Sequence, residues 1–308
     1  MLYIQREVKS DSMDEIELHE LTVNERDRYL NHYVHSCPLI SDYVYSSLFM
    51  WAEFYTLKIS YYMDLACIIC TGGGFPPSLL MPLGMTENKM KSILDYYYQW
   101  FDSRGQEFCI SHVEDRFLPL IQSIESYDFS VTYDRNYSDY IYLKPDFINM
   151  DGHNYKGLKK KIRSFNNHHQ NVEYSKIKTD DISECKELLD TWRTQKGYNA
   201  DSAETVKLLD NYEELKLLGG AVRINGKLQA FFLGEEFDDT GYIISGKADM
   251  DIHGLYIMGV REFVKNEFPG VKYINRCEDL GIETLRDAKL SWMPAKILHK
   301  YNVRCSRK

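Results

Sequence analysis

Two alternating apolar runs joined by an Asn-Gly pair are the local feature that most constrains the fold of this chain. They lie at residues 221–232, where Asn225-Gly226 separates AVRI from KLQAFF. Asn-Gly readily adopts the two positive φ angles of a type I′ turn, whose twist matches that of paired antiparallel strands. The segment therefore predicts a β-hairpin.

The residues after this hairpin predict a strand, a helix and a further strand. Residues 241–248 form a strand-like run, and a helix is expected to begin near Gly254. Apolar residues at helical spacing continue to Phe268, where Pro269-Gly270 ends the helix. Residues 271–275 then return as a strand. The predicted unit is hairpin, strand, helix, strand.

The first half of the chain can be divided in the same order. Its elements are two paired strands at 54–63 and 65–70, a short strand at 79–83, a helix from Thr86 to Gly105, and a strand at 107–111. An order that occurs twice predicts a duplicated module. We therefore expect an α/β (α+β) fold of two modules, 1–138 and 139–308, each with helices against a mixed, antiparallel-rich sheet.

Length and composition fit a folded protein of two such modules. The chain has 308 residues, of which 44% are hydrophobic and 27% charged, as is ordinary for globular proteins. No run of eighteen apolar residues occurs, and residues 1–18 mix charges with few apolar side chains. We therefore expect neither a membrane-spanning helix nor a secretory leader, and place the protein in the cytoplasm.

Cysteine and histidine patterns do not predict a metal site. Seven cysteines scattered over a long chain favour reduced thiols over a disulfide framework. Cys67 and Cys70 form a C-x-x-C pattern, but in a strand their thiols point to opposite faces. The adjacent His168 and His169 diverge on a helix, so they are interpreted as surface polar residues.

Charge is distributed unevenly between the halves. The whole chain has 37 basic and 46 acidic side chains, net −9. Residues 1–150 contain 11 basic and 22 acidic side chains, net −11, which leaves 26 and 24, net +2, for residues 151–308. A protein that coats nucleic acid along its whole surface is therefore not expected, and no DNA partner is predicted. Contact with a polyanion must be local.

Two segments are strongly basic. Four lysines and an arginine fall within residues 156–163, and no acid occurs between Asp151 and Glu173. Their spacing places most of them on one face of a helix. A second basic run, from Lys289 to Lys308, also contains no acid. Each run is interpreted either as a solvated helix face or as a phosphate-binding surface.

The predicted order of elements is similar to the acetyltransferase-like (GNAT) fold. That resemblance implies that the pyrophosphate of an acyl-CoA lies on backbone amides at the start of the helix that follows the third strand. The corresponding segment here is 247–254, which lacks the usual glycine-rich pattern. His253 and Gly254 can present amides to a phosphate, whereas Asp249 and Asp251 would repel it. The alternative is that His253-Gly254 only begins a helix.

The most distinctive segment is residues 273–294. A buried strand ends in Asn275-Arg276-x-Glu278-Asp279, which gathers an amide, a guanidinium and two carboxylates at a strand terminus. Ligands bind at such termini in open α/β sheets. Gly281 then allows a turn into a helix that carries Arg286 and Lys289. A structural network of ion pairs is the competing interpretation.

This segment resembles the family of the C-terminal catalytic domain of phosphatidylglycerol lysyltransferase. The motifs are 275–281 (NRCEDLG) and 285–294 (LRDAKLSWMP), supported by 139–142 (DYIY) and 161–167 (KIRSFNN). They span about residues 139–294 in the family's order. The family is similar to peptidoglycan-bridge aminoacyltransferases, which are also tandem acetyltransferase-like modules. Departures include Ile162, Cys277, Trp292 and the missing membrane helices, which leave the lipid acceptor unassigned.

The resemblance implies acyl transfer from a phosphorylated carrier, aminoacyl-tRNA or acyl-CoA, to an amine or hydroxyl. A carboxylate accepts the acceptor's proton, and a cation or amide meets the oxyanion. Adjacent residues leaving a strand face opposite ways, so one of Glu278 and Asp279 is expected in the cleft, and we favour Asp279. The implied catalytic residues are Asp279, Glu278, Arg276, Arg286 and Lys289.

The basic helix and the loop before the second helix are implied to hold the donor, with only the acceptor end of a tRNA engaged. The implied donor-phosphate residues are Lys160, Lys161, Arg163, Asn167, His253 and Gly254, and the implied acceptor-binding or orienting residues are Asn275 and Asn166. No metal cofactor is implied. Two alternatives remain: a CoA- or nucleotide-binding protein of this fold without turnover, and an interaction protein built from decayed transferase modules. Everything in the transferase interpretation depends on the strand end and the basic helix sharing one crevice.

Overall fold

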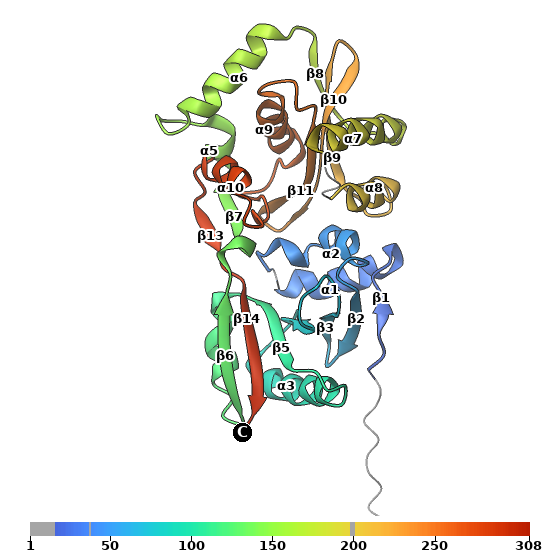
Figure 1. The fold of residues 1–308 in the computed structure, drawn as a ribbon, viewed down its shortest axis with the longest axis vertical. Coiled ribbons are helices and arrows are strands. Elements are labelled where there is room, and N and C mark those ends of the chain that lie inside the picture. The colour runs from blue at the N-terminus through green and yellow to red at the C-terminus, as the bar shows by residue number, and fades with distance from the viewer. Residues whose placement is uncertain (1–15, 37, 198–200) are drawn as a thin grey trace, which may run out of the picture.

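The computed structural model describes residues 16–36, 38–197 and 201–308. In these residues the strands form two seven-stranded mixed sheets, one in each module, and the modules lie end to end (Figure 1). The predicted absence of a secretory leader concerns residues 1–18, most of which lie outside the described residues. No helix within the described ranges is long and apolar enough to cross a membrane.

The N-terminal module is built on a sheet that includes the last strand of the chain. In spatial order its strands are β1 (His19–Glu20), β2 (Leu57–Tyr62), β3 (Leu65–Cys70), β4 (Ser78–Leu80), β5 (Phe108–Val113), β14 (Tyr301–Arg307) and β6 (Tyr127–Tyr133). The helices of this module are α1 (Arg26–Ser36), α2 (Tyr45–Trp51), α3 (Glu87–Asp102) and α4 (Leu118–Gln122), with short 3-10 turns η1 (Val23–Glu25), η2 (Ser41–Tyr43), η3 (Asp115–Phe117) and η4 (Arg135–Tyr137).

The C-terminal module has the second sheet. In spatial order its strands are β13 (Lys296–Leu298), β7 (Asp139–Leu143), β12 (Tyr273–Asn275), β11 (Thr240–Ala248), β10 (Lys227–Phe237), β9 (Leu218–Ile224) and β8 (Val172–Lys176). Its helices are α5 (Lys144–Asn149), α6 (Lys156–His168), α7 (Ile182–Lys196), α8 (Ser202–Asp210), α9 (Leu255–Glu267) and α10 (Glu283–Leu290), with the turn η5 (Thr179–Asp181).

The predicted repeat of elements is confirmed. In the first module the hairpin β2–β3 is followed by β4, α3 and β5, and in the second the hairpin β9–β10 is followed by β11, α9 and β12. Each sheet contains one parallel pair, β4–β5 and β11–β12, because a helix crosses between those two strands. Asn225 and Gly226 have φ angles of 51° and 82°, as the type I′ turn requires.

Strand β7 begins at Asp139, and the last strand of the chain lies in the first sheet instead of the second. Strand β14 lies between β5 and β6 of the N-terminal sheet, and β13 remains at the edge of the C-terminal sheet. Figure 1 shows the last strand, in red, running back alongside β6. The chain therefore crosses the module boundary a second time, between Leu298 and Tyr301.

The core is continuous across this boundary. Strand β10 is buried on both faces: Phe232 packs toward α9, whereas Phe231 and Leu233 join the cluster that also contains the N-terminal core. Buried polar contacts reinforce the boundary, since Arg26 of α1 pairs with Glu235 of β10 at 3.0 Å. The two modules thus form one packed body rather than independent domains.

Candidate functional site at the module boundary

Strand β12 ends at the module boundary, where Asn275 is fully buried. Its Nδ2 donates to the Leu39 carbonyl at 2.9 Å and to Asp139 Oδ2 at 2.8 Å, and its Oδ1 accepts from the Cys277 amide at 2.7 Å. These contacts occupy the side-chain amide inside the protein. Asn275 therefore joins the two modules and fixes the turn that follows it, rather than facing a substrate.

Glu278 and Asp279 point in opposite directions, as expected for adjacent residues that leave a strand. The Asp279 carboxylate is fully buried and accepts from Arg286 Nε at 3.0 Å, Tyr140 Oη at 2.5 Å and the Gly281 amide at 2.9 Å. Arg135 adds an ion pair at 3.3 Å.

Although burial alone would raise the pKa of Asp279, the bonds from Arg286 and Tyr140 lower this pKa to about 2. Both of its oxygens are occupied, so the geometry around Asp279 favours the competing interpretation of a structural ion-pair network. A carboxylate held in this way is also a weak proton acceptor at neutral pH.

Glu278 faces the boundary and keeps 23% of its side chain exposed. Its carboxylate, with those of Asp42 and Asp139, forms a set of oxygens within 4.8 Å of one another. Burial raises the pKa of Glu278, and the charges of Asp42 and Asp139 raise it further against the opposing effect of Lys300. A carboxylate with a raised pKa is a stronger proton acceptor than an ordinary one.

Lys300 occupies the centre of these three carboxylates. Its ammonium lies 2.8 Å from Asp139 and 3.3 Å from Glu278, and it also contacts Asp42. Although burial opposes it, the three carboxylates raise the pKa of Lys300 well above its ordinary value. The group has the composition of a cation site, but the lysine ammonium already supplies the positive charge, so the three acids do not require a metal.

The N-terminal module contributes two residues that the sequence did not point to. Asp42, in η2, is 3.2 Å from Nε2 of His112, which lies in β5 with φ of 56°. Although burial acts in the other direction, Lys300 and His112 lower the pKa of Asp42. No local motif marks these residues, because they meet Glu278 only when the modules pack together.

Lys289 supports the turn that carries Glu278. Its Nζ donates to the carbonyls of Arg276 at 2.5 Å and Cys277 at 3.1 Å, and also to that of Glu278. The side chain is buried, and burial lowers the pKa of Lys289 to about 8. Cys277 has φ of 55°, a strained conformation that these bonds help to hold. Lys289 thus positions the strand end instead of offering a free cation.

Arg276 is buried, and no carboxylate of the described residues forms an ion pair with it. It is 7% exposed, and Nη1 has no hydrogen-bond partner. The guanidinium lies 5.3 Å from the ring centroid of Trp292 and 5.8 Å from those of Tyr142 and Phe147. Trp292, a departure from the family pattern, is therefore a wall of this aromatic enclosure. A buried guanidinium nitrogen without a hydrogen-bond partner is suited to an anion or a developing oxyanion.

The basic helix α6 lies at the outer end of the C-terminal module (Figure 1). Lys160, Lys161, Arg163, Asn166 and Asn167 are exposed, and none of the ion pairs found in the described ranges includes them. Leu158, Ile162 and Phe165 pack into the module core instead.

Helix α6 packs on the start of α9. A Cβ placed on Gly254 would lie 2.6 Å from the Lys161 carbonyl oxygen, so α6 covers this helix start closely. In the preceding loop, Gln195 Oε1 accepts from the Met250 amide at 3.0 Å, and Asp249 accepts from the Asp251 amide at 3.0 Å. Two loop amides are thus already bonded, and α6 lies directly against Gly254.

The two groups of predicted residues do not converge on one crevice. Lys161 and Gly254 lie together at the outer end, whereas the residues from Asn275 to Lys289 gather at the module boundary. Between the parts of these groups that the structure describes, no hydrogen bond or ion pair is formed. A donor that contacts both groups must therefore extend from α6 to the module boundary.

The second basic run is not a helix, and most of its cations have acidic partners. Its last residues form β14, where Arg304 pairs with Glu107 at 3.3 Å and Arg307 with Asp95 at 3.6 Å. Residues distant in sequence supply these acids, so the run of cations is accounted for by pairing within the sheet.

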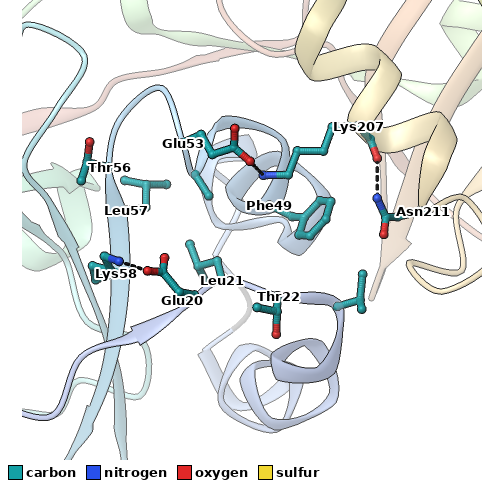
Figure 2. A pocket seen from close by; sticks show the side chains of 12 residues that line it. Glu20, Leu21, Thr22, Phe49, Glu53, Thr56, Leu57, Lys58, Lys207 and Asn211 are labelled. Atoms are coloured by element: carbon teal, nitrogen blue, oxygen red, sulfur yellow. Dashed lines mark hydrogen bonds and ion pairs between the residues drawn. The ribbon is translucent and has the colours of Figure 1, made fainter.

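A surface cleft of about 510 Å³ lies on another side of the boundary (Figure 2). Phe49 and Leu57 form part of its wall, and Lys207 of α8 meets Glu53 beyond α2 at 3.0 Å across the modules. None of the predicted site residues lines it.

Two acetyltransferase-like modules in tandem, joined by a C-terminal strand that returns to the first sheet, define the fold class of this protein. The chain belongs to the family described as phosphatidylglycerol lysyltransferase, C-terminal, whose signature matches residues 38–304. Among curated proteins, none matches the chain by sequence.

Solved structures extend this comparison. A conserved protein of unknown function from Bacteroides thetaiotaomicron has 30% identity and a TM-score of 0.87, over 94% of this chain and 100% of that one. L-PGS from Bacillus licheniformis has 13% identity and a TM-score of 0.64, over 90% and 91% of the two chains. FemX has 9% identity and a TM-score of 0.58, over 92% and 97%. The latter two are similar in fold.

Proposed function

We propose that this protein is an aminoacyltransferase that takes its aminoacyl group from aminoacyl-tRNA and passes it to an amine or hydroxyl acceptor at the module boundary. The described residues do not form the single crevice on which the transferase interpretation of the sequence depended, so the reaction class rests instead on membership of the lysyltransferase family. The observation that favours this choice of donor is the close packing of α6 on the start of α9, where the fold would hold the pyrophosphate of acyl-CoA: a Cβ on Gly254 would lie 2.6 Å from the Lys161 carbonyl oxygen.

The distribution of free cations also favours tRNA. Exposed and unpaired Lys160, Lys161 and Arg163 stand on one helix, away from the boundary. A tRNA acceptor arm is long enough to contact both this helix and the boundary, whereas CoA requires a single continuous groove. Asn166 and Asn167 on the same helix then contact ribose or phosphate oxygens.

In this proposal Glu278 replaces Asp279 as the proton acceptor. Glu278 is accessible, has a raised pKa and is held by Lys300 at 3.3 Å, whereas the oxygens of Asp279 are already bonded. The acceptor's nucleophilic atom forms a bond to the aminoacyl carbonyl carbon and gives its proton to Glu278. The ester bond to the ribose oxygen breaks, and that oxygen takes the proton from Glu278 as it leaves, which restores the carboxylate.

Arg276 stabilises the oxyanion that forms on the carbonyl oxygen during this step. Its Nη1 is buried and has no hydrogen-bond partner among the residues that the structure describes. Removing a preorganised donor of this kind typically costs ~3 kcal/mol of transition-state stabilisation. Arg286 and Lys289 act indirectly, since one holds Asp279 and the other holds the carbonyls of the turn.

The test uses the purified chain and a labelled pool of aminoacyl-tRNA. Binding is measured by filter retention over a range of salt concentrations, and loss of the aminoacyl ester is followed with hydroxylamine as a surrogate acceptor. We expect retention that weakens with salt by a slope of about −0.7 to −0.9 per phosphate contact. The triple variant Lys160→Gln, Lys161→Gln, Arg163→Gln should flatten this slope.

Acetyl-CoA serves as the competing donor in the same assay. Saturable acetyl-CoA binding with no retention of aminoacyl-tRNA would overturn the choice of donor. Retention of aminoacyl-tRNA without any enzyme-dependent loss of the ester would instead support a binding protein of this fold. Glu278→Gln provides the control for spontaneous aminolysis, because it is expected to bind tRNA normally.

A further inference from the structure

Four aromatic side chains form a continuous strip on the N-terminal module. Phe54 and Tyr55 follow α2, Phe75 follows the Gly72-Gly73-Gly74 turn, and Tyr137 ends η4. Successive ring centroids are 4.9, 6.0 and 5.8 Å apart. Phe54 is 53% exposed and Phe75 is 44% exposed. Exposed rings in contact with one another are unusual on a protein surface and mark a surface that binds a partner.

The backbone is built to hold Phe75 in this strip. Gly73 has φ of 70°, and a Cβ on it would lie 2.3 Å from a ring atom of Tyr55. The turn can therefore pack against Tyr55 only because it contains glycine. This accounts for a glycine-rich segment to which neither the fold nor the proposed reaction assigns a role.

The strip runs to the candidate functional site. Tyr55 is close enough to Asp42 and Glu278 that, after burial, their charges contribute most to raising the pKa of its hydroxyl. At the other end, Tyr137 follows Asn136, whose side chain accepts from Arg286 at 2.7 Å. The strip therefore ends at η4, the turn that carries Arg135 and contacts Arg286 through Asn136, and the charges of Asp42 and Glu278 act on Tyr55 within it.

Two arginines lie beside Tyr137 although the module as a whole is acidic. Arg135 and Arg286 both pair with the carboxylate of Asp279, and Asp134 lies on the same turn, where its side chain accepts from the Asn136 amide. The side chains of Arg135 and Arg286 are 29% and 32% exposed. Proteins bind single-stranded nucleic acids with surfaces of this kind, on which bases stack on aromatic rings and phosphates contact arginine guanidinium groups.

We infer that this strip is a stacking platform for the unpaired 3′ end of the donor tRNA. The inference rests on the proposed function and names how its substrate is held. Stacking needs a π-face and no positive surface, so it is compatible with the acidic module that would repel a duplex. The platform leads the terminal nucleotide, which carries the aminoacyl ester, toward Glu278 and Arg276.

The test compares Phe75→Leu with Phe75→Tyr. Leucine keeps an apolar side chain but removes the π-face, whereas tyrosine keeps the ring. Tyr133→Leu is the control, because Tyr133 is 43% exposed on the same module but its ring contacts those of His299 and Tyr301 instead of the strip. The probe is a fluorescent single-stranded oligoribonucleotide with the sequence of the tRNA 3′ end, measured by anisotropy.

We expect Phe75→Leu to weaken binding of this probe between about fivefold and about 150-fold, the equivalent of one lost base stack. Phe75→Tyr and Tyr133→Leu should bind within about twofold of the unchanged chain. Equal binding by Phe75→Leu and Phe75→Tyr would overturn the platform. The platform would also be overturned, in favour of an apolar partner, by a second outcome. In that outcome no variant binds the oligoribonucleotide, and both the unchanged chain and Phe75→Leu bind anionic vesicles equally.

The outcome is separable from that of the proposed function. If the chain consumes aminoacyl-tRNA and Phe75→Leu does so with an unchanged KM, the platform is wrong and the function stands. If the chain consumes no aminoacyl-tRNA yet binds the oligoribonucleotide through Phe75, the function is wrong and a single-strand-binding surface remains.

Discussion

Glu278 and Lys300 form an ion pair across the module boundary, with 3.3 Å between Oε2 and Nζ. Glu278 follows the last parallel strand of the C-terminal module, and Lys300 lies just before β14, which returns to the N-terminal sheet. The return of the chain to the N-terminal sheet therefore places the Lys300 ammonium among carboxylates that both modules supply. Stability and the proposed chemistry depend on the same residues.

Lys300→Met is expected to destabilise the fold by ~3 to 5 kcal/mol, because it leaves three buried or half-buried carboxylates without their shared cation. Urea unfolding followed by circular dichroism measures the loss. Lys308→Met is the matched control: its lysine is 54% exposed and pairs with Asp128 at 3.8 Å, so a change within ~0.5 kcal/mol is expected. Equal stability of the two variants would show that Lys300 does not neutralise the group.

Glu278→Gln is expected to reduce the transfer rate by a factor of ~10² to 10⁴, the typical contribution of a general base. The amide can still contact Lys300, so the free energy of unfolding should change by less than about 1 kcal/mol. Single-turnover loss of the aminoacyl ester is the measurement. A variant that reacts at the rate of the unchanged chain would remove Glu278 from the mechanism.

The pH dependence of transfer follows from the same carboxylate. Its ionised form is the base, and its pKa is raised by burial and by neighbouring carboxylates. The rate should therefore fall as pH decreases, with a midpoint above that of an ordinary glutamate. Glu278→Gln should lack this acid limb in its residual rate. An acid limb that persists in the variant would assign it to another group.

Asp279 is expected to stabilise the fold in a pH-dependent way. The pKa of Asp279 in the folded state, about 2, lies below the ordinary value of 3.8. The folded state therefore stabilises the ionised carboxylate relative to the protonated form. The contribution, about 2 kcal/mol from the shift, is complete above pH ~5 and is lost as pH falls toward 2.

Asp279→Asn should therefore lose about 2 kcal/mol at pH 7 and depend less on pH than the unchanged chain does between pH 5 and pH 3. The midpoints of urea unfolding at pH 7, pH 5 and pH 3, measured for the variant and for the unchanged chain, check this. Parallel pH profiles for the variant and the unchanged chain would contradict the ion-pair assignment.

Gly254→Ala tests the packing that closes the start of α9. Alanine at φ of 86° is strained, and its Cβ would also meet the Lys161 carbonyl at 2.6 Å. Gly152→Ala is a matched control, since Gly152 has φ of 95° and nothing within 4 Å of an added Cβ. Both variants lose folding stability because alanine is strained at positive φ. Gly254→Ala should lose ~1 to 3 kcal/mol more than Gly152→Ala because of the added contact. If urea unfolding shows that both variants lose the same stability, α6 moves away from the added methyl group at little cost and does not close the start of α9.

Local patterns were sufficient for the elements and their repetition. The Asn225-Gly226 turn, the apolar stripe of α9 and the Thr86 start of α3 are all decided by residues close in sequence, and each lies where it was predicted. The motif that ends β12 was enough to assign the family. It also predicted that Glu278 and Asp279 diverge, because side chains alternate along an extended chain.

Only the tertiary structure decided which residues meet. Asp42, His112, Asp139 and Lys300 are far apart in sequence and gather around Glu278 because the modules pack together and β14 crosses back. Sequence pattern could not decide whether Asp279 or Glu278 is the proton acceptor. Arg135, which bonds to the Asp279 carboxylate, lies 144 residues away in the chain. Sequence sets the conformation of short segments through local sterics, whereas pKa values and pairing depend on distances that exist only after packing.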